Sequence, residues 1–245
     1  MVTSVYLVVA LALTVALNVR QGITPRITVT LFALAVPAGS IGSRLLDVLE
    51  YWGRYQSVGD VVGRHGSSIY GGLLAGFAVA WAYAATQGVP PLRLLDAGGP
   101  VVALGEAMTR IGCFLNGCCY GVPWSGRLAV TFPQESFAFR DQVARGLLAS
   151  SAPRSLPVHP VHPVQLYSTV VMLGVSLYLL RRFTRRRYDG EVFFAFLVAY
   201  GVLRLLVAPL RMEALASMKV FNLVFIVCGG LGLTLARPAT SRSAS

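Results

Sequence analysis

The chain has 245 residues, of which 55 % are hydrophobic and only 13 % are charged, and its mean hydropathy is +0.65. This composition excludes an ordinary soluble domain of this size and indicates an integral membrane protein. The formal net charge of +11 does not indicate a nucleic-acid binder, because the arginines lie between apolar segments rather than on one face.

Seven apolar segments are each long enough to span the roughly 30 Å hydrocarbon core of a bilayer as a helix. We read the first as a retained spanning helix, since no small-residue cleavage site follows it. Pro37 interrupts the second segment and Pro100 the fourth, and Gly71 and Gly76 in the third favour close approach to another helix. We predict an all-α integral membrane protein with about seven transmembrane helices, at residues 2–19, 28–46, 68–87, 95–116, 163–181, 191–209 and 215–236.

One sizeable hydrophilic insertion divides the chain. Within it, residues 128–132 have a strand-like composition, and residues 134–150 predict a short amphipathic helix on the membrane surface. We find no internal repeat of the kind that builds two-halved transporters. The predicted organisation is therefore four transmembrane helices, a small extracytoplasmic head over the mouth of a cavity, three more helices and a disordered cytoplasmic tail, at residues 1–117, 118–162, 163–236 and 237–245.

The distribution of arginine predicts the orientation. With the amino terminus outside, five arginines between Arg181 and Arg187 fall in a short inner loop directly against a helix end, where the positive-inside rule has most weight. The head also contains arginines, but long loops influence orientation little. The stretch from Gly105 to Gly121 should then open to the outer side.

That stretch, GEAMTRIGCFLNGCCYG, combines charge with cysteine and glycine at the end of an apolar run. A charge at membrane depth costs about 2.5–3.5 kcal/mol, so Arg110 needs a partner, a watery cavity or an anionic ligand. Glu106 lies four residues earlier on the same helical face and offers an intrahelical pair. A pair alone explains neither the glycines nor the polar residues that follow.

Short motifs occur in order along the helices. They are Tyr6, Gly42-Ser43-Arg44-Leu45, Gly71-Gly72-Leu73, Arg110-Ile111-Gly112 with Phe114, Asn116, Gly117 and Gly121, HPVQLYS at 162–168, and Tyr200-Gly201 with Arg204 and Arg211. Together they resemble, nearly end to end, the prolipoprotein diacylglyceryl transferase family, bacterial enzymes that lipidate the cysteine of lipoprotein precursors. Each motif alone is weak, but their order and spacing are specific.

Several positions depart from the family pattern. Tyr70 stands where the family has a functionally important histidine, and other family residues are replaced by Glu106, Cys113, Cys118, Ser168 and Ala208. The lipid-phosphate arginines are kept, whereas several groups that handle protons or orient substrates in the family are changed. A general base is therefore hard to name. His65 is one candidate, with a solvated loop histidine as the alternative, and Tyr70 suits hydrogen-bond donation better than proton abstraction.

The resemblance implies an enzyme that moves the diacylglyceryl group of phosphatidylglycerol to a cysteine thiol of a lipoprotein precursor and releases glycerol phosphate. Arg110 and Arg204 should clamp the phosphate, since guanidinium stays charged and binds phosphate oxygens in a fork; the alternative for Arg204 is a pair with Glu106. Arg110, Arg204, Tyr70 and His65 are the predicted catalytic residues. Predicted substrate-binding residues are Tyr6, Gly71, Gly72, Glu106, Cys113, Asn116, Gly121, Gln165, Tyr167, Tyr200 and Arg211.

For Asn116, Gln165 and Tyr167, hydrogen bonding between helices is the alternative role. No cofactor and no metal are expected. The expected partners are phosphatidylglycerol, a lipoprotein precursor or other acceptor, and the membrane, with no nucleic acid. The protein should lie in the bacterial cytoplasmic membrane with its active site opening outward. Two other functions stay open: a related phospholipid-using transferase with a different acceptor, and a non-catalytic lipid-binding or transport protein.

Three cysteines stand close together in the sequence. In an oxidising compartment Cys113 and Cys118 are allowed to form a disulfide that braces the turn after the helix. A zinc site with His159 and His162 would lack the usual paired ligand spacings. We therefore expect a structural role for the cysteines.

Overall fold

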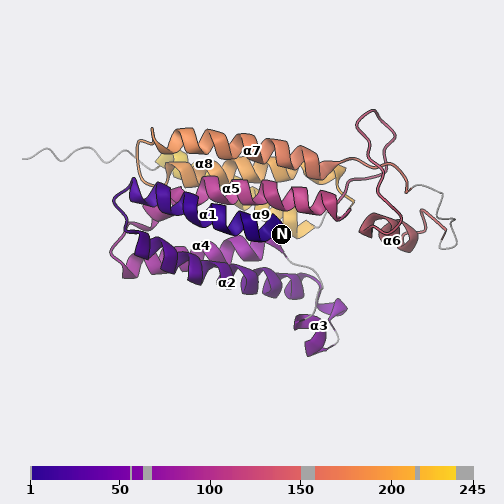
Figure 1. Cartoon of the computed structure of the whole chain (residues 1–245), viewed down its shortest axis with the longest axis horizontal. Helices are drawn as coiled ribbons and strands as arrows, with labels where there is room; N and C mark the ends of the chain where they lie inside the picture. Colours follow the sequence, from indigo (N-terminus) through magenta and orange to yellow (C-terminus); the bar gives the residue numbers. More distant parts are fainter. Residues whose placement is uncertain (1, 56, 63–67, 150–157, 213–215, 236–245) are drawn as a thin grey trace, which may run out of the picture.

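The computed structural model describes residues 2–55, 57–62, 68–149, 158–212 and 216–235. In these residues seven long helices form one bundle, with their axes roughly along its longest dimension (Figure 1). They coincide with the predicted apolar segments. They are α1 (Val2–Val19), α2 (Pro25–Glu50), α4 (Ile69–Thr86), α5 (Pro91–Leu115), α7 (Val164–Phe183), α8 (Glu191–Val207) and α9 (Ala216–Leu235).

Five helices in the described part of the chain are long and apolar enough to cross a membrane: α2, α4, α7, α8 extended to Leu210, and the part of α9 from Met218. The all-α class of a multi-pass membrane protein is thus confirmed. That α1 and α5 also cross stays a prediction. Helix α5, which is not among the five, carries four charged residues, Arg93, Asp96, Glu106 and Arg110.

The prolines predicted to interrupt helices do not do so. Helix α2 runs through Pro37 and α5 runs through Pro100. The predicted close approach is confirmed for one glycine of α4, because a methyl group on Gly71 would lie 2.1 Å from the carbonyl oxygen of Gly42 in α2. Gly76, one turn further on, faces open space.

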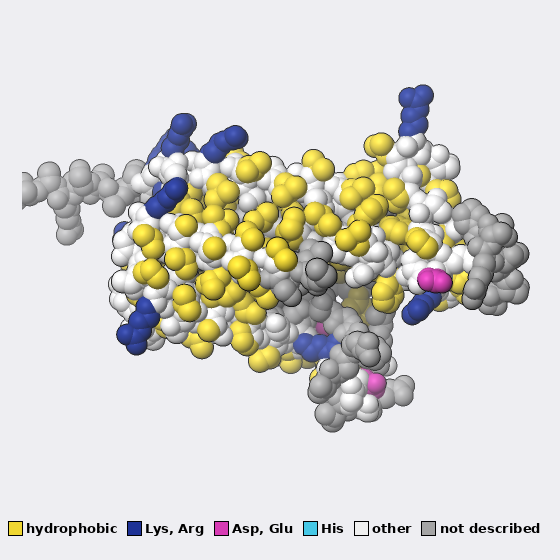
Figure 2. Space-filling model, viewed as in Figure 1, with side chains coloured by type: hydrophobic (Ala, Val, Ile, Leu, Met, Phe, Trp, Pro, Cys, Tyr) yellow, Lys and Arg dark blue, Asp and Glu magenta, His cyan; other side chains and the backbone are white. Residues whose placement is uncertain are grey.

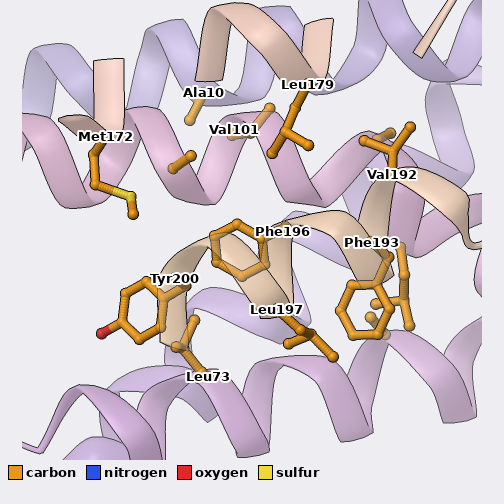
Figure 3. Packing of buried hydrophobic residues seen from close by; sticks show 14 of the residues in the cluster. Ala10, Leu73, Val101, Met172, Leu179, Val192, Phe193, Phe196, Leu197 and Tyr200 are labelled. Atoms are coloured by element: carbon orange, nitrogen blue, oxygen red, sulfur yellow. The ribbon is translucent and has the colours of Figure 1, made fainter. Parts of the chain in front are cut away.

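Helix α5 occupies the centre of the bundle, packing against α1, α4, α7 and α8. Its neighbours satisfy backbone groups along it: the Ser176 hydroxyl donates to the carbonyl oxygen of Pro100 at 2.8 Å. Figure 3 shows the apolar core around it, including Phe196 and Tyr200 of α8. A polar side chain on the inner face of α5 is therefore enclosed by protein rather than by lipid.

The connections α1–α2, α4–α5 and α7–α8 lie at one end of the bundle (Figure 1). In Figure 2 hydrophobic side chains cover the visible flank, and several Lys or Arg side chains gather at this end. Asp96 caps helix α8 here, accepting from the backbone N–H groups of Gly190 at 2.8 Å and Phe193 at 2.9 Å. Arg182 pairs with Glu191.

The head, residues 118–162, lies at the opposite end with the short helix α6 (Phe137–Ala144) (Figure 1). It has a small core of its own, formed by Tyr120, Phe132, Ala138, Val158 and Val161. The prediction of a strand at 128–132 is wrong, since only Val130 pairs, in an isolated bridge with Val161. The helix predicted at 134–150 is shorter and buries Ala138 in the head core.

Three short helices complete the described residues: η1 (Trp52–Arg54), α3 (Val58–Val62) and η2 (Ala208–Leu210). Helix η2 follows α8 directly and leads to Arg211, which faces Gly121 of the head in an isolated bridge. The predicted tail at 237–245 lies outside the described residues, as do residues 150–157 of the head.

Candidate functional site

A buried charge cluster lies inside the bundle where α5 meets α8. The Oε1 atom of Glu106 accepts from Arg110 Nε at 2.8 Å and Nη2 at 2.7 Å, and Arg204 Nη1 lies 4.0 Å from the same oxygen. All three residues are buried. Both pairings considered from the sequence are thus present at once. One carboxylate balances only one of two guanidinium groups, so the cluster keeps an excess positive charge that favours an anionic ligand.

Tyr70 fixes the position of Arg204. Its hydroxyl donates to Asn222 Oδ1 at 3.0 Å and accepts from Arg204 Nε at 3.4 Å. This arrangement fits the hydrogen-bonding role considered for Tyr70 rather than that of a base. Asn222 was not predicted. In the sequence Asn222 stands out only as the one amide side chain of a mostly apolar segment, and nothing there indicates that it bonds to a tyrosine of α4.

Two polar atoms of the cluster have no hydrogen-bond partner among the described residues: the hydroxyl of Tyr200 and Oε2 of Glu106. Leaving a buried polar group unpaired costs about 1–3 kcal/mol. Both residues line a cavity of about 170 Å³, together with Tyr6 and Thr109. The unpaired oxygens are therefore candidates for contact with a ligand in this cavity.

An apolar cavity of about 240 Å³ adjoins the polar one. It lies between α1, α2, α4 and α5, and the two cavities share Tyr6, Leu73 and Val102 in their walls. The Tyr6 hydroxyl donates to the Val101 carbonyl oxygen at 3.1 Å, and a methyl on Gly105 would lie 2.2 Å from that hydroxyl. The adjoining cavities suit an amphiphile with apolar chains and an anionic head.

A third cavity, of about 410 Å³, opens on the head side. Its wall contains the described residues Cys118, Cys119, Tyr120, Phe137, Arg140, Asp141, Arg211 and Met212. Hydrogen bonds from the Cys113 and Cys118 thiols lower the pKa of Cys119, and the positive charges of Arg110 and Arg211 lower it further. Burial, followed by the charges of Arg204 and Arg110, lowers the pKa of Arg211. The head-side cavity thus adjoins the buried arginines.

All four cysteines are free thiols in the structure, so the disulfide considered between Cys113 and Cys118 is not formed. The sulfur atoms of Cys113, Cys118 and Cys119 nevertheless lie within 4.8 Å of one another. Neither histidine considered as a zinc ligand joins them. The His162 ring stacks on Trp124 with centroids 4.1 Å apart, and a ring nitrogen of His159 bonds to the Leu147 carbonyl.

Comparison with known sequences identifies the family. The prolipoprotein diacylglyceryl transferase profile matches residues 1–236. The chain belongs to this family. One similar enzyme, named phosphatidylglycerol--prolipoprotein diacylglyceryl transferase, is that of Symbiobacterium thermophilum, 30 % identical over 256 residues that cover 97 % of this chain and 89 % of the relative.

Two further relatives carry the same name. That of Dehalococcoides mccartyi strain 195 is 26 % identical over 209 residues, covering 84 % of this chain and 74 % of the relative. That of Clostridium tetani is 30 % identical over 171 residues, covering 67 % of this chain and 62 % of the relative. The family profile, which matches residues 1–236, includes the helices that hold the charge cluster.

Of the residues predicted for a transferase site, one group converges on the cluster. It comprises Tyr6, Tyr70, Glu106, Arg110, Cys113, Tyr200, Arg204 and Arg211. Two other predicted residues contact the segments that follow α5 and α8. Gln165 donates to the Cys118 carbonyl oxygen at 2.8 Å, and Gly121 packs against His162 and the backbone of η2.

The remaining predicted residues lie away from the charge cluster. Gly71 packs on α2, and Gly72 contacts the same helix while lining the apolar cavity. Asn116 is exposed at the end of α5, and the Tyr167 ring lies near that of His162, with centroids 6.3 Å apart. His65 lies outside the described residues. The functional roles given to these residues stay predictions.

Proposed function

We propose that this protein transfers the diacylglyceryl group of phosphatidylglycerol to a cysteine thiol of a lipoprotein precursor. The observation that carries this proposal is the buried pair of arginines facing a single carboxylate beside an apolar cavity. A phosphodiester carries one negative charge, which would balance the excess positive charge. The relatives' names supply the donor and the acceptor.

In the proposed complex the acyl chains occupy the apolar cavity between α1, α2, α4 and α5 and continue into the bilayer. The phosphate lies between Arg110 and Arg204, and the unpaired Tyr200 hydroxyl donates to one of its oxygens. The free Oε2 of Glu106 accepts from a hydroxyl of the headgroup glycerol. Each unpaired polar atom of the cavity thereby gains a partner.

The reaction is a displacement at carbon. The acceptor thiolate attacks the glyceryl carbon that bears the phosphate ester, a C–S bond forms, and the C–O bond breaks with its electron pair leaving on the phosphate oxygen of glycerol phosphate. Charge increases on that phosphate, where Arg110 and Arg204 are already in place to stabilise it. The acceptor approaches through the head-side cavity, while both acyl chains stay in hydrocarbon.

We place the protein in the bacterial cytoplasmic membrane with the head outside. The short arginine-rich loop 184–190 lies at the opposite end of the bundle from the head, and the positive-inside rule puts such a loop in the cytoplasm. This orientation gives the acceptor cysteine access from the extracytoplasmic side.

The test uses the purified full chain in detergent with phosphatidylglycerol labelled in its acyl chains. A peptide with one cysteine serves as acceptor, and the same peptide with serine is the control. Mass analysis should find the diacylglyceryl adduct on the cysteine peptide only. An adduct on neither peptide, with lipid bound but unchanged, would refute transfer to cysteine and favour a lipid-binding protein.

A further inference from the structure

The end of α5 and the turn after it bring three thiols together. Cys113 lies in the last turn of the helix, and the Cys118 N–H donates to the Cys113 carbonyl oxygen at 3.0 Å. Gly117 (φ +64°) and Cys119 (φ +58°) both have left-handed backbone conformations. Cysteine rarely adopts this conformation, and such residues cluster at functional sites. The turn folds back so that all three sulfur atoms lie within 4.8 Å of one another.

The neighbouring segments hold this turn in place. The Gln165 amide of α7 donates to the Cys118 carbonyl oxygen at 2.8 Å, and the Gly121 N–H donates to the His162 carbonyl at 2.9 Å. A methyl group on Gly117 would lie 2.8 Å from Ser136 of the head. The three thiols are therefore positioned by α5, α7 and the head together rather than by a free loop.

We propose that Cys113, Cys118 and Cys119 bind one zinc ion as thiolates and leave its fourth position open to the head-side cavity. Zinc–sulfur bonds of about 2.3 Å in a tetrahedron place sulfur atoms about 3.8 Å apart, so each pair must close by about 1 Å at most. Thiolate ligands select soft ions such as zinc over magnesium or calcium. The sequence argued against a zinc site because neither Cys113, Cys118 and Cys119 nor His159 and His162 have the usual paired ligand spacings, whereas the proposed site uses the three cysteines alone.

The surrounding charges fit a zinc trithiolate. Three thiolates and a divalent ion carry a net charge of −1, and Arg211 lies in the same cavity wall as Cys118 and Cys119. A bare divalent ion beside this arginine would be repelled, whereas the trithiolate complex is attracted. Bound zinc also keeps all three ligands deprotonated without an additional base.

The open position faces the cavity, since Cys118 and Cys119 lie in its wall. Zinc with three protein ligands keeps a fourth place for water or substrate. Resting on the proposed function, we assign this place to the acceptor thiol: the acceptor sulfur displaces water, forms a Zn–S bond and gives its proton to solvent. The resulting thiolate then attacks the glyceryl carbon as described above.

This assignment gives a route to the acceptor thiolate that does not depend on a carboxylate of the cavity wall. Asp141 is the one carboxylate among the described residues of its wall. Its oxygens already accept from the Tyr120 hydroxyl at 2.5 Å and from Arg145 Nε at 3.0 Å. Metal coordination lowers the pKa of a bound thiol directly, so no free base is needed at this place.

The first experiment counts metal. Full-length protein is reduced, stripped with a chelator, reloaded with Zn²⁺, desalted and analysed by elemental mass spectrometry, with an expected content of about one zinc per chain. Single changes Cys113→Ser, Cys118→Ser and Cys119→Ser should each lower zinc affinity at least about tenfold, the effect of outer-shell changes alone. Cys228→Ser on α9 is the matched control and should bind zinc as the parent does.

The zinc content of the parent protein tests the proposal even if a variant misfolds. Reduced parent protein that takes up no zinc overturns the proposal. The open position is tested by titrating the Co²⁺-loaded protein with the cysteine peptide. A stronger sulfur-to-cobalt absorption with that peptide, and none with the serine peptide, supports it. An unchanged spectrum with both peptides overturns it.

Activity separates this inference from the proposed function. If metal-stripped and zinc-loaded protein transfer lipid at equal rates, the zinc assignment fails and the transferase stands. If zinc and the peptide thiol bind as expected but no lipid adduct forms, the proposed function fails and the metal site stands.

Discussion

Replacing Arg204 by alanine tests the phosphate clamp most directly. Its guanidinium lies 4.0 Å from Glu106 and donates to Tyr70 at 3.4 Å, so its loss leaves the closer Arg110–Glu106 pair and the Tyr70–Asn222 bond intact. Removing one preorganised donor from a developing charge costs about 2.7–4 kcal/mol, which lowers kcat by roughly 100- to 1,000-fold. Initial rates of lipid transfer to the cysteine peptide measure this loss.

Arg110→Ala should lose as much activity and also lower stability, because Glu106 loses both of its hydrogen bonds to that side chain. Arg182→Ala is the matched control, since this arginine also pairs with a glutamate but lies at the other end of the bundle. It should keep near-normal kcat. Turnover within about tenfold of the parent in both Arg204→Ala and Arg110→Ala would remove the clamp from the mechanism.

Three further predictions concern stability and orientation. Glu106→Ala leaves two buried arginines without a carboxylate and should cost about 3–5 kcal/mol, seen as a lower thermal midpoint in detergent; an unchanged midpoint would contradict the pairing. Gly71→Ala should cost about 1–3 kcal/mol because the methyl meets the α2 backbone, whereas Gly76→Ala, facing open space, should not; equal midpoints would count against the close crossing. Leu128 in the head and Thr184 at the opposite end of the bundle are both exposed, so each can be replaced by a single cysteine in a cysteine-free background. A membrane-impermeant thiol reagent on intact cells should label Leu128→Cys but not Thr184→Cys. The reverse pattern would invert the topology.

The helices were predictable because apolar length is a local property. The segment predicted at 191–209 begins at the same residue as α8, and the segment predicted at 68–87 extends one residue beyond each end of α4. Helix α2 runs through Pro37 and beyond both predicted ends. Its last turns, near Asp47, are polar enough to fall outside an apolar window. In the head, burial of Ala138 and Val161 in a small core outweighs the strand propensity of residues 128–132.

Within the site, sequence spacing predicted a contact between two side chains only where both lie on the same helix. Four residues separate Glu106 from Arg110, and the predicted pair is present. By contrast 152 residues separate Tyr70 from Asn222, so only the three-dimensional fold, which places the Tyr70 ring against Phe221 of α9, reveals their bond. The grouping of three thiols likewise depends on left-handed turns at Gly117 and Cys119, which cysteine spacing alone does not encode.

The head is attached to the bundle by backbone hydrogen bonds from both sides of the insertion. Val122 N–H donates to the Leu210 carbonyl at 2.9 Å, and the His162 N–H donates to the Val122 carbonyl at 3.1 Å. The apolar cavity lies elsewhere, with part of its wall formed by the outer helix α2. A lipid that enters between helices on the α2 side would leave these bonds in place. We therefore expect the lipid and the acceptor to reach the buried arginines from different sides of the molecule, so that neither has to move aside for the other.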